Sequence, residues 1–400
     1  MTENLLRQFL DGHSYDIRQT GNGRWIDQKC TPDEVSFVSE CVLEYVRESG
    51  KSVFQSPDVW KSDFAVAKVQ QFFGKPDPLV RSALDEYNKF FRQPLKMLAA
   101  AGVLKENGRL NNTIQFEVVN ADVLAFLARN DWNAYTFLHL YIEKTLRDSG
   151  IWDLFATFLD QRTKKNFDEM KDGFVGFCKT YTPIRTAVEA NRIFAKVLNP
   201  LACRYHTVGT VAGRMSPMTI TFNLLSYNRA NWRDMDKPKD VARRDYGKAN
   251  QQSSSAYFTE KAMDEVKKFN KQFNGGHSEV LGKHSGGEAT QMHHIFPRSE
   301  FPEIAAFVEN VIPLTPTQHF TLAHPNNNTA RVDAEFQYCC LLAKNETVRK
   351  NVMLGYGTPG FYSFDKFAFV LDVGFGTDHF RNIPQNDFTS VRCGIAARFE

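Results

Sequence analysis

One segment in the C-terminal part of the chain constrains the fold most tightly, because three prolines divide it into short pieces. Pro297 ends a possible strand over residues 292–296, since proline cannot donate a hydrogen bond within a sheet. A second apolar run, residues 310–314, predicts another short strand. Pro316 follows a threonine that can cap a helix, and Pro325 prevents that helix from continuing. The segment therefore predicts strand, loop, strand and helix, in that order.

Histidines are concentrated in the same segment. The chain has 10 histidines, of which four lie here: His293, His294, His319 and His324. Simple proportion predicts about 0.8 histidines in a window of this length. A hairpin packed on a helix can bring His293 and His294 near His319, which favours a common site. The alternative is a set of core or surface histidines whose nitrogens are satisfied by their neighbours.

The order of these residues resembles the HNH, or ββα-metal, nucleases. The pair His293–His294 is followed by Asn310 on the second strand and then by His319 in the sequence TPTQH, which is most similar to the colicin and pyocin DNase branch of that family. About 40 of the 400 residues carry this resemblance. The long front half also makes the chain similar to bacterial Type II restriction endonucleases that contain an HNH domain.

The resemblance implies a role for each of these residues. His293 and His319 are implied as metal ligands. His294 is implied as the general base that takes a proton from the attacking water, and Asn310 as the residue that holds the loop around that base. Phosphodiester hydrolysis needs such an activated water, together with stabilisation of charge on the phosphoryl oxygens. Imidazole suits the base because its ordinary pKa of about 6.5 leaves it largely neutral at cellular pH.

The fourth histidine departs from the pattern of the family. His324 lies five residues after His319, about 140° around an α-helix, whereas the colicin pattern has a separation of four. Only a frayed or tightened last turn before Pro325 brings both side chains to one metal. We include His324 as a third ligand. The alternative is a two-histidine site completed by water and phosphate, in which His324 caps the helix or contacts DNA.

The implied cofactor is one divalent metal ion per active site. Imidazole ligands permit zinc, nickel or cobalt, phosphoryl chemistry often uses magnesium or manganese, and the sequence does not choose among them. The seven cysteines include no CxxC pair, which argues against an additional structural zinc. Arg298, just after the first strand, is a candidate for holding the scissile phosphate. An ordinary exposed arginine is the alternative.

The front of the chain predicts a winged helix. Helical patterns cover residues 31–50, 57–73 and 77–102, and Asn107–Gly108 then predicts the turn of a hairpin. Three helices followed by a hairpin form a winged helix, whose third helix can enter the major groove of DNA. The polar face of that helix carries five candidate DNA contacts: Arg81, Asn88, Lys89, Arg92 and Lys96. A solvated face, or a winged helix that binds protein, is the alternative.

The middle of the chain, residues 131–240, predicts a packed helical domain whose later part alternates basic and aromatic residues. We expect three further DNA contacts there: Arg214, Arg229 and Arg233. An ordinary domain interface has a similar composition. The predicted fold class is α+β, multidomain and mostly helical, with a winged-helix-like domain over residues 1–130 and an HNH nuclease domain over 241–400. Aromatic runs in the last 50 residues predict a small additional sheet.

Composition limits the partners and the compartment. Lys and Arg total 49 against 46 Asp and Glu, so contact with a nucleic acid must come from locally sorted charge and not from the average. An odd set of cysteines without disulfide spacing favours a reducing compartment. No apolar stretch is long enough to predict a membrane span or a signal peptide. We therefore expect a soluble protein of a bacterial-type cytoplasm, without a membrane partner.

These features predict a metal-dependent endonuclease that acts on double-stranded DNA, most economically a Type II restriction enzyme. A palindromic target implies a homodimer with one active site for each strand. Two alternatives stay open. One is a non-specific or phage-defence nuclease, and the other is a winged-helix transcriptional regulator with a structural metal site.

Overall fold

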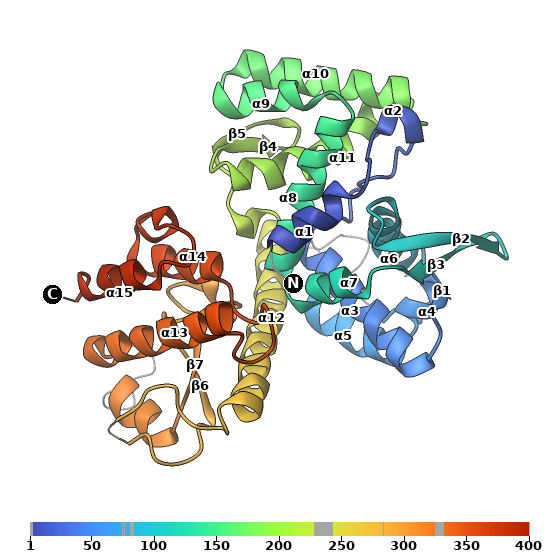
Figure 1. Cartoon of the computed structure of the whole chain (residues 1–400). Helices are drawn as coiled ribbons and strands as arrows, with labels where there is room; N and C mark the ends of the chain where they lie inside the picture. Colours follow the sequence, from blue (N-terminus) through green and yellow to red (C-terminus); the bar gives the residue numbers. More distant parts are fainter. Residues whose placement is uncertain are drawn as a thin grey trace. The chain divides into compact units, whose positions relative to one another are not determined.

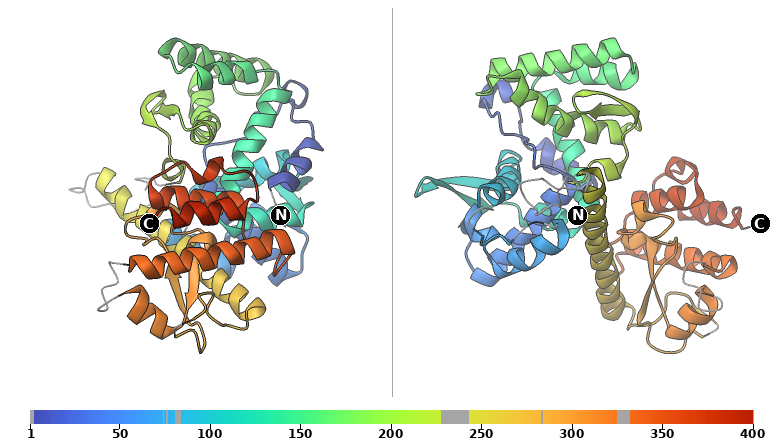
Figure 2. Two further views of the ribbon diagram at one scale, coloured as in Figure 1. Left: turned by 60° about the vertical axis from the view of Figure 1, so that its left-hand side comes forward. Right: turned by 180° about the vertical axis from the view of Figure 1, so that it is seen from behind.

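The computed structural model describes residues 3–227 except 74, 76 and 81–83, residues 243–324 except 283, and residues 332–399; for residues 70, 71, 223 and 243–255 it describes the backbone alone. These residues form two compact units, Glu3–Ser253 and Ser254–Glu400 (Figure 1, Figure 2). Helices dominate both units, and the sheets are small. The predicted class, α+β and mostly helical with more than one domain, is confirmed at this level.

The division between the units falls late in the chain. We predicted boundaries near residues 130 and 240. The segments on both sides of residue 130 belong to the first unit, and the second unit begins at Ser254, within α12 (Arg243–Phe273). Three of the candidate DNA contacts lie outside the described residues: Arg81, Arg229 and Arg233.

The front of the first unit has helices followed by a hairpin, in the predicted order. Its elements are α1 (Glu3–Asp11), α2 (Ile17–Thr20), α3 (Pro32–Ser49), β1 (Val53–Gln55), α4 (Ser56–Trp60), α5 (Asp63–Phe73), α6 (Leu84–Ala100), β2 (Leu104–Leu110), β3 (Thr113–Val118) and α7 (Ala121–Arg129). The sheet has the antiparallel order β1-β3-β2. α3 starts after Thr31 and ends at Gly50, whose φ of 66° is the left-handed cap expected of a glycine. Whether this layout works as a winged helix stays a prediction.

The turn of the hairpin lies further along the chain than we predicted. Asn111 and Asn112 join β2 to β3, with φ angles of 49° and 62°. Two residues with positive φ match the twist of a two-residue hairpin turn, and asparagine tolerates that conformation. Gly108, with a φ of 88°, lies instead inside β2, where the register shifts between Glu106 and Arg109. The Asn-Gly pair therefore forms an irregularity in the strand and not its end.

The remainder of the first unit is a helical layer followed by a second hairpin. Its elements are α8 (Asp131–Asp148), α9 (Trp152–Asp160), α10 (Lys164–Tyr181), α11 (Ala187–Arg204), β4 (Val208–Val211) and β5 (Arg214–Thr219). The helices agree with the prediction for the middle of the chain. β4 and β5 pair antiparallel and were not predicted.

A buried charged cluster connects the start of α3 to α6. The carboxylate of Asp33 accepts the backbone N–H of Tyr227 at 2.9 and 2.8 Å from its two oxygens. The ammonium groups of Lys29 and Lys75 both donate to Glu86 of α6 and to the Tyr227 hydroxyl. Buried charges are tolerated when they are paired and hydrogen-bonded. The cluster therefore fixes α6 against α3 on the side of α6 that carries Glu86.

Glu34 in this region predicts a pH-dependent stability. Its side chain is fully buried, and one carboxyl oxygen accepts the Thr31 hydroxyl at 2.9 Å. Burial raises the pKa of the Glu34 carboxyl from 4.5 to about 8. The folded chain therefore keeps a proton that the unfolded chain loses, so the stability contributed by this group is complete below pH 4.5 and is lost as the pH rises towards 8.

The Glu34→Gln variant cannot ionise and is expected to escape this loss. Its free energy of unfolding, measured by urea titration, should rise relative to the wild type by at least about 1 kcal/mol between pH 4.5 and pH 8, since one pKa unit corresponds to about 1.4 kcal/mol. A difference between the two proteins that stays constant with pH would contradict this assignment.

The second unit contains the predicted strand, loop, strand and helix. β6 (Gln291–His294) pairs antiparallel with β7 (Val311–Leu314), with His293 opposite Ile312 and His294 opposite Val311. The helix after β7 starts at Pro316, and the hydroxyl of Thr315 accepts the backbone N–H of Gln318 as its cap. Three further helices follow: α13 (Ala334–Leu354), α14 (Phe364–Phe375) and α15 (Phe388–Ala396).

The last 50 residues are helical, so the predicted additional sheet is wrong. Phe364, Phe367 and Leu371 are all buried on α14, at the three- and four-residue spacing of a helix. Ser363 caps α14 and Asp387 caps α15. The aromatic run was apolar enough to suit either element, and burial against the other helices of the unit selected the helix. None of the described helices is both long and apolar enough to cross a membrane.

Candidate metal centre

The two adjacent histidines of β6 occupy different environments. His293 is buried, with 3% of its surface exposed, whereas His294 is partly exposed. This difference follows from the pleat of a strand, which directs neighbouring side chains to opposite faces. The resemblance had implied different roles for these two residues.

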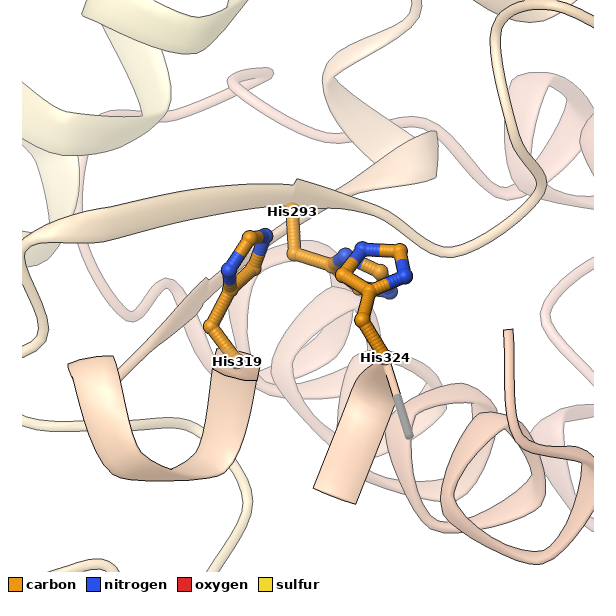
Figure 3. Close-up of side chains that lie close together, drawn as sticks. All are labelled: His293, His319 and His324. Carbon is orange, nitrogen blue, oxygen red and sulfur yellow. The ribbon is translucent and has the colours of Figure 1, made fainter. Parts of the chain in front are cut away.

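Three histidines converge on one point, as Figure 3 shows. His293 comes from β6, while His319 and His324 come from the helical segment that follows β7. The ring centroids are 5.4 Å apart for His293 and His319, 5.0 Å for His293 and His324, and 4.8 Å for His319 and His324. One nitrogen from each ring lies within 4.8 Å of the other two. Within the described parts of the chain, no other group of metal-ligating side chains meets this distance.

A change of helix type brings His324 to the site. The backbone N–H of His319 donates to the Thr315 carbonyl, four residues back, at 3.0 Å. The N–H of His324 donates to the His319 carbonyl, five residues back, at 3.2 Å, and Gln318–Ala323 is a π-helix. A five-residue hydrogen bond aligns residues that are five apart. The last turn is therefore widened, and not frayed or tightened as we had considered.

The site favours neutral imidazoles. Burial lowers the pKa of His293 from 6.5 to about 3, and the neighbouring His319 and His324 lower it further. Burial also lowers the pKa of His319. The Nε2 atom of His293 and the Nδ1 atom of His319 are buried without a hydrogen-bond partner. Unprotonated, unpartnered nitrogens are what a metal ion requires of its ligands.

The donor set fits a transition metal. In a tetrahedral zinc site with Zn–N bonds of about 2.0–2.1 Å, two nitrogens lie about 3.3 Å apart, so modest side-chain rotation closes the observed triad. Imidazole nitrogen suits zinc, nickel, cobalt and copper, whereas magnesium and calcium prefer oxygen ligands. Three protein ligands leave a fourth position for water or substrate.

His294 is arranged to accept a proton. Its Nε2 donates to the Ala305 carbonyl at 3.0 Å, and this bond places the ring proton on Nε2 and leaves the lone pair on Nδ1. Burial lowers the pKa of His294, the hydrogen bond to Ala305 raises it, and the charge of Arg298 lowers it again. The pKa of His294 is lowered overall, which favours the neutral imidazole that can accept a proton.

Asn310 holds the loop that follows β6, as the resemblance implied. It is fully buried, and its Oδ1 accepts the N–H of Phe296 at 2.9 Å. Its Nδ2 donates to the carbonyls of Phe296 and Ile304 at 3.0 and 3.3 Å. Ile304 directly precedes Ala305, the partner of His294. Asn310 therefore fixes the carbonyl that orients the base.

The other predicted site residues are distributed over both units. Arg298 is exposed in the second unit, close enough to His294 for its charge to affect the pKa of that imidazole. In the first unit Lys89 and Arg92 are exposed on α6, Asn88 and Lys96 are half-buried there, and Arg214 is exposed at the start of β5.

Sequence reasoning missed Gln318. This residue has no exposed surface, and it bonds to Thr315 and to the Val280 carbonyl. A signal was present, because threonine followed three residues later by glutamine is a capping-box pattern. The contact with Val280 joins residues far apart in the sequence and had no local signature.

Comparisons with family models, with curated protein sequences and with solved structures find no match to this chain. The resemblance to HNH nucleases therefore rests on the residues themselves.

The geometry predicts that zinc or cobalt stabilises the folded protein. At a free metal concentration 100 times the dissociation constant, binding to the folded state adds about 2.7 kcal/mol, which calorimetry detects as a higher melting temperature. His319→Ala and His324→Ala should each remove most of this increment, because each deletes one of three ligands. His277→Ala, which replaces an exposed histidine of the same unit, is the control and should retain it.

The same two variants also show whether three histidines or two bind the metal. If metal raises the melting temperature of His324→Ala as much as that of the wild type, the two-histidine site completed by water and phosphate is favoured. The absence of any metal effect on the wild type would contradict the metal centre.

Proposed function

We propose that this protein is a metal-dependent endonuclease that hydrolyses phosphodiester bonds in double-stranded DNA. The observation that carries the proposal is the placement of His294. His294, whose neutral imidazole is held by the Ala305 carbonyl, directly follows His293 of the triad on β6, and its charge is close enough to affect the pKa of His293. Hydrolysis of a phosphodiester needs this combination of a base and a cation.

The residues of the chain divide the work of the reaction. His294 Nδ1 takes a proton from the attacking water, because Nε2 is committed to Ala305. Asn310 keeps that carbonyl in place through the loop after β6. Arg298, exposed beside the base, is available to a phosphate oxygen. His293, His319 and His324 would hold a divalent metal, which would supply charge stabilisation for the phosphoryl oxygens and the leaving oxygen.

A site-specific enzyme of the restriction type is the biological role that we favour. In this proposal the first unit grips DNA through α6, where Lys89 and Arg92 are exposed, with Arg214 of β5 as a further contact. The overall charge of +3 leaves most DNA weakly bound, which suits a protein that must release non-cognate sequence. A homodimer places one centre on each strand of a palindrome.

The first test of the proposal is cleavage of plasmid DNA with zinc, nickel, cobalt, manganese or magnesium. The wild type is expected to give discrete fragments, and His294→Ala to lower the cleavage rate by about 100- to 10,000-fold, since it deletes the general base. Metal-induced stabilisation should survive in His294→Ala, because the triad is intact. His277→Ala serves again as the control.

The pattern of products separates the remaining alternatives. Random degradation to short oligonucleotides by the wild type would overturn the restriction role and favour a non-specific or phage-defence nuclease. Metal-dependent DNA binding without cleavage would overturn the nuclease and favour a regulator with a structural metal.

The proposed role of α6 predicts a change in salt dependence. Lys89→Ala and Arg92→Ala should each weaken DNA binding uniformly across sequences and reduce the slope of log K against log[salt] by about 1, because each removes one phosphate contact. Fluorescence anisotropy over a range of salt concentrations measures the slope. Lys165→Ala, at an exposed lysine of α10, is the matched control. A slope that is unchanged in both α6 variants would contradict this assignment.

A further inference from the structure

We propose that Gln318 is the positioning residue of the metal centre, acting with Thr315 to hold the α-to-π transition that brings His319 and His324 together. This inference rests on the metal site of the proposed function and is independent of the reaction that the site catalyses.

The segment changes from α-helix at residues 316–317 to π-helix at Gln318–Ala323. The N–H of His319 donates to the Thr315 carbonyl, four residues back, and the N–H of His324 donates to the His319 carbonyl, five residues back. A π turn inside a helix is rare and persists where its surroundings determine it. The structure must therefore hold both the start and the end of this turn.

Gln318 holds the start through three hydrogen bonds. Its Oε1 accepts the N–H of Thr315 at 3.3 Å, and its own N–H donates to the Thr315 hydroxyl at 3.2 Å, which closes a reciprocal capping box. Its Nε2 donates to the Val280 carbonyl at 2.9 Å. The Thr315 hydroxyl in turn donates to the His284 carbonyl at 2.8 Å. Gln318, directly before His319, is thus tied to a loop that lies far away in the sequence.

The end of the turn is held by α13. The backbone N–H of Asp333, the cap residue of α13, donates to the Ala323 carbonyl at 3.0 Å. Both ends of the π-helix are therefore held by hydrogen bonds from other segments of the unit. Partners that orient metal ligands typically contribute about 10- to 100-fold to metal affinity.

The test is cobalt binding to the full chain, followed by the visible absorption of Co²⁺ and by competition with a chelator. Gln318→Leu removes both side-chain bonds and leaves the carbonyl of Val280 without this donor. It is expected to weaken Co²⁺ affinity by about 10- to 100-fold and to change the absorption band.

Thr315 supplies a second pair of variants in case the buried leucine prevents folding. Thr315→Val deletes the hydroxyl that Gln318 and His284 share, whereas Thr315→Ser keeps it. The valine variant is expected to lose Co²⁺ affinity and the serine variant to recover it. Thr317→Ala, at an exposed position of the same turn, is the control and should bind Co²⁺ as the wild type does.

The outcomes separate this inference from the function. Wild-type affinity and spectrum in a folded Gln318→Leu or Thr315→Val would overturn the positioning role. A merely structural role lowers the melting temperature of the metal-free protein and leaves the Co²⁺ affinity unchanged, which also counts against the proposal. Failure of the wild type to bind Co²⁺ overturns the metal centre as a whole. Tight Co²⁺ binding without DNA cleavage overturns the nuclease and leaves the positioning role standing.

Discussion

The convergence of the three histidines depends on one backbone hydrogen bond, from the N–H of His324 to the carbonyl of His319. Two histidines five residues apart diverge by about 140° on an α-helix, and that angle cannot serve a single ion. The five-residue hydrogen bond of the π-helix removes this angle between the two side chains without any change in the sequence. The rest of the centre, including the burial of His293 opposite them, is useful only once this turn is in place.

The electrostatics of the site follow from burial. Three imidazoles whose ligating nitrogens lie within 4.8 Å of one another would repel if they were protonated, and a buried charge has no solvent to offset that cost. Lowered pKa values at His293 and His319 are the result. Neutral nitrogens that face one another offer their lone pairs to a divalent ion, and the bonds to those lone pairs offset the cost of burying its charge.

Much of this site could be read from the sequence, and the reasons are local. Prolines indicated where the first strand stops and where the helix starts, and the pleat separated His293 from His294. Asn310 lies at the end of a short 3-10 helix (Val308–Asn310), directly before β7 and not on the strand as we predicted, yet its side chain bonds to the loop after β6. The π turn could not be read, because it depends on Val280 and Asp333, which approach from elsewhere in the unit.

The errors elsewhere have the same physical origin. Asn107–Gly108 is a strong local signal for a turn, yet the pairing of Leu110 with Thr113 placed the turn at the two asparagines that follow. The aromatic run near Phe364 suited strand or helix equally, and the choice came from burial against the other helices of its unit. Local sequence signals indicated which secondary-structure elements were possible, and tertiary contacts determined which of them formed.

The two histidines of β6 illustrate how a single residue type can serve two tasks. His293 has a buried nitrogen without a hydrogen-bond partner, so it can act as a ligand. His294 has one nitrogen fixed by a carbonyl, so its other nitrogen can act as a base. Environment, and not residue identity, separates these roles. Exchanging the environments of the two histidines would require a change in the pleat of β6 and a new position for the Ala305 carbonyl. Asn310 holds the loop that supplies this carbonyl. The hairpin therefore gives each histidine a different environment, with a buried unpartnered nitrogen at His293 and a carbonyl-held ring at His294.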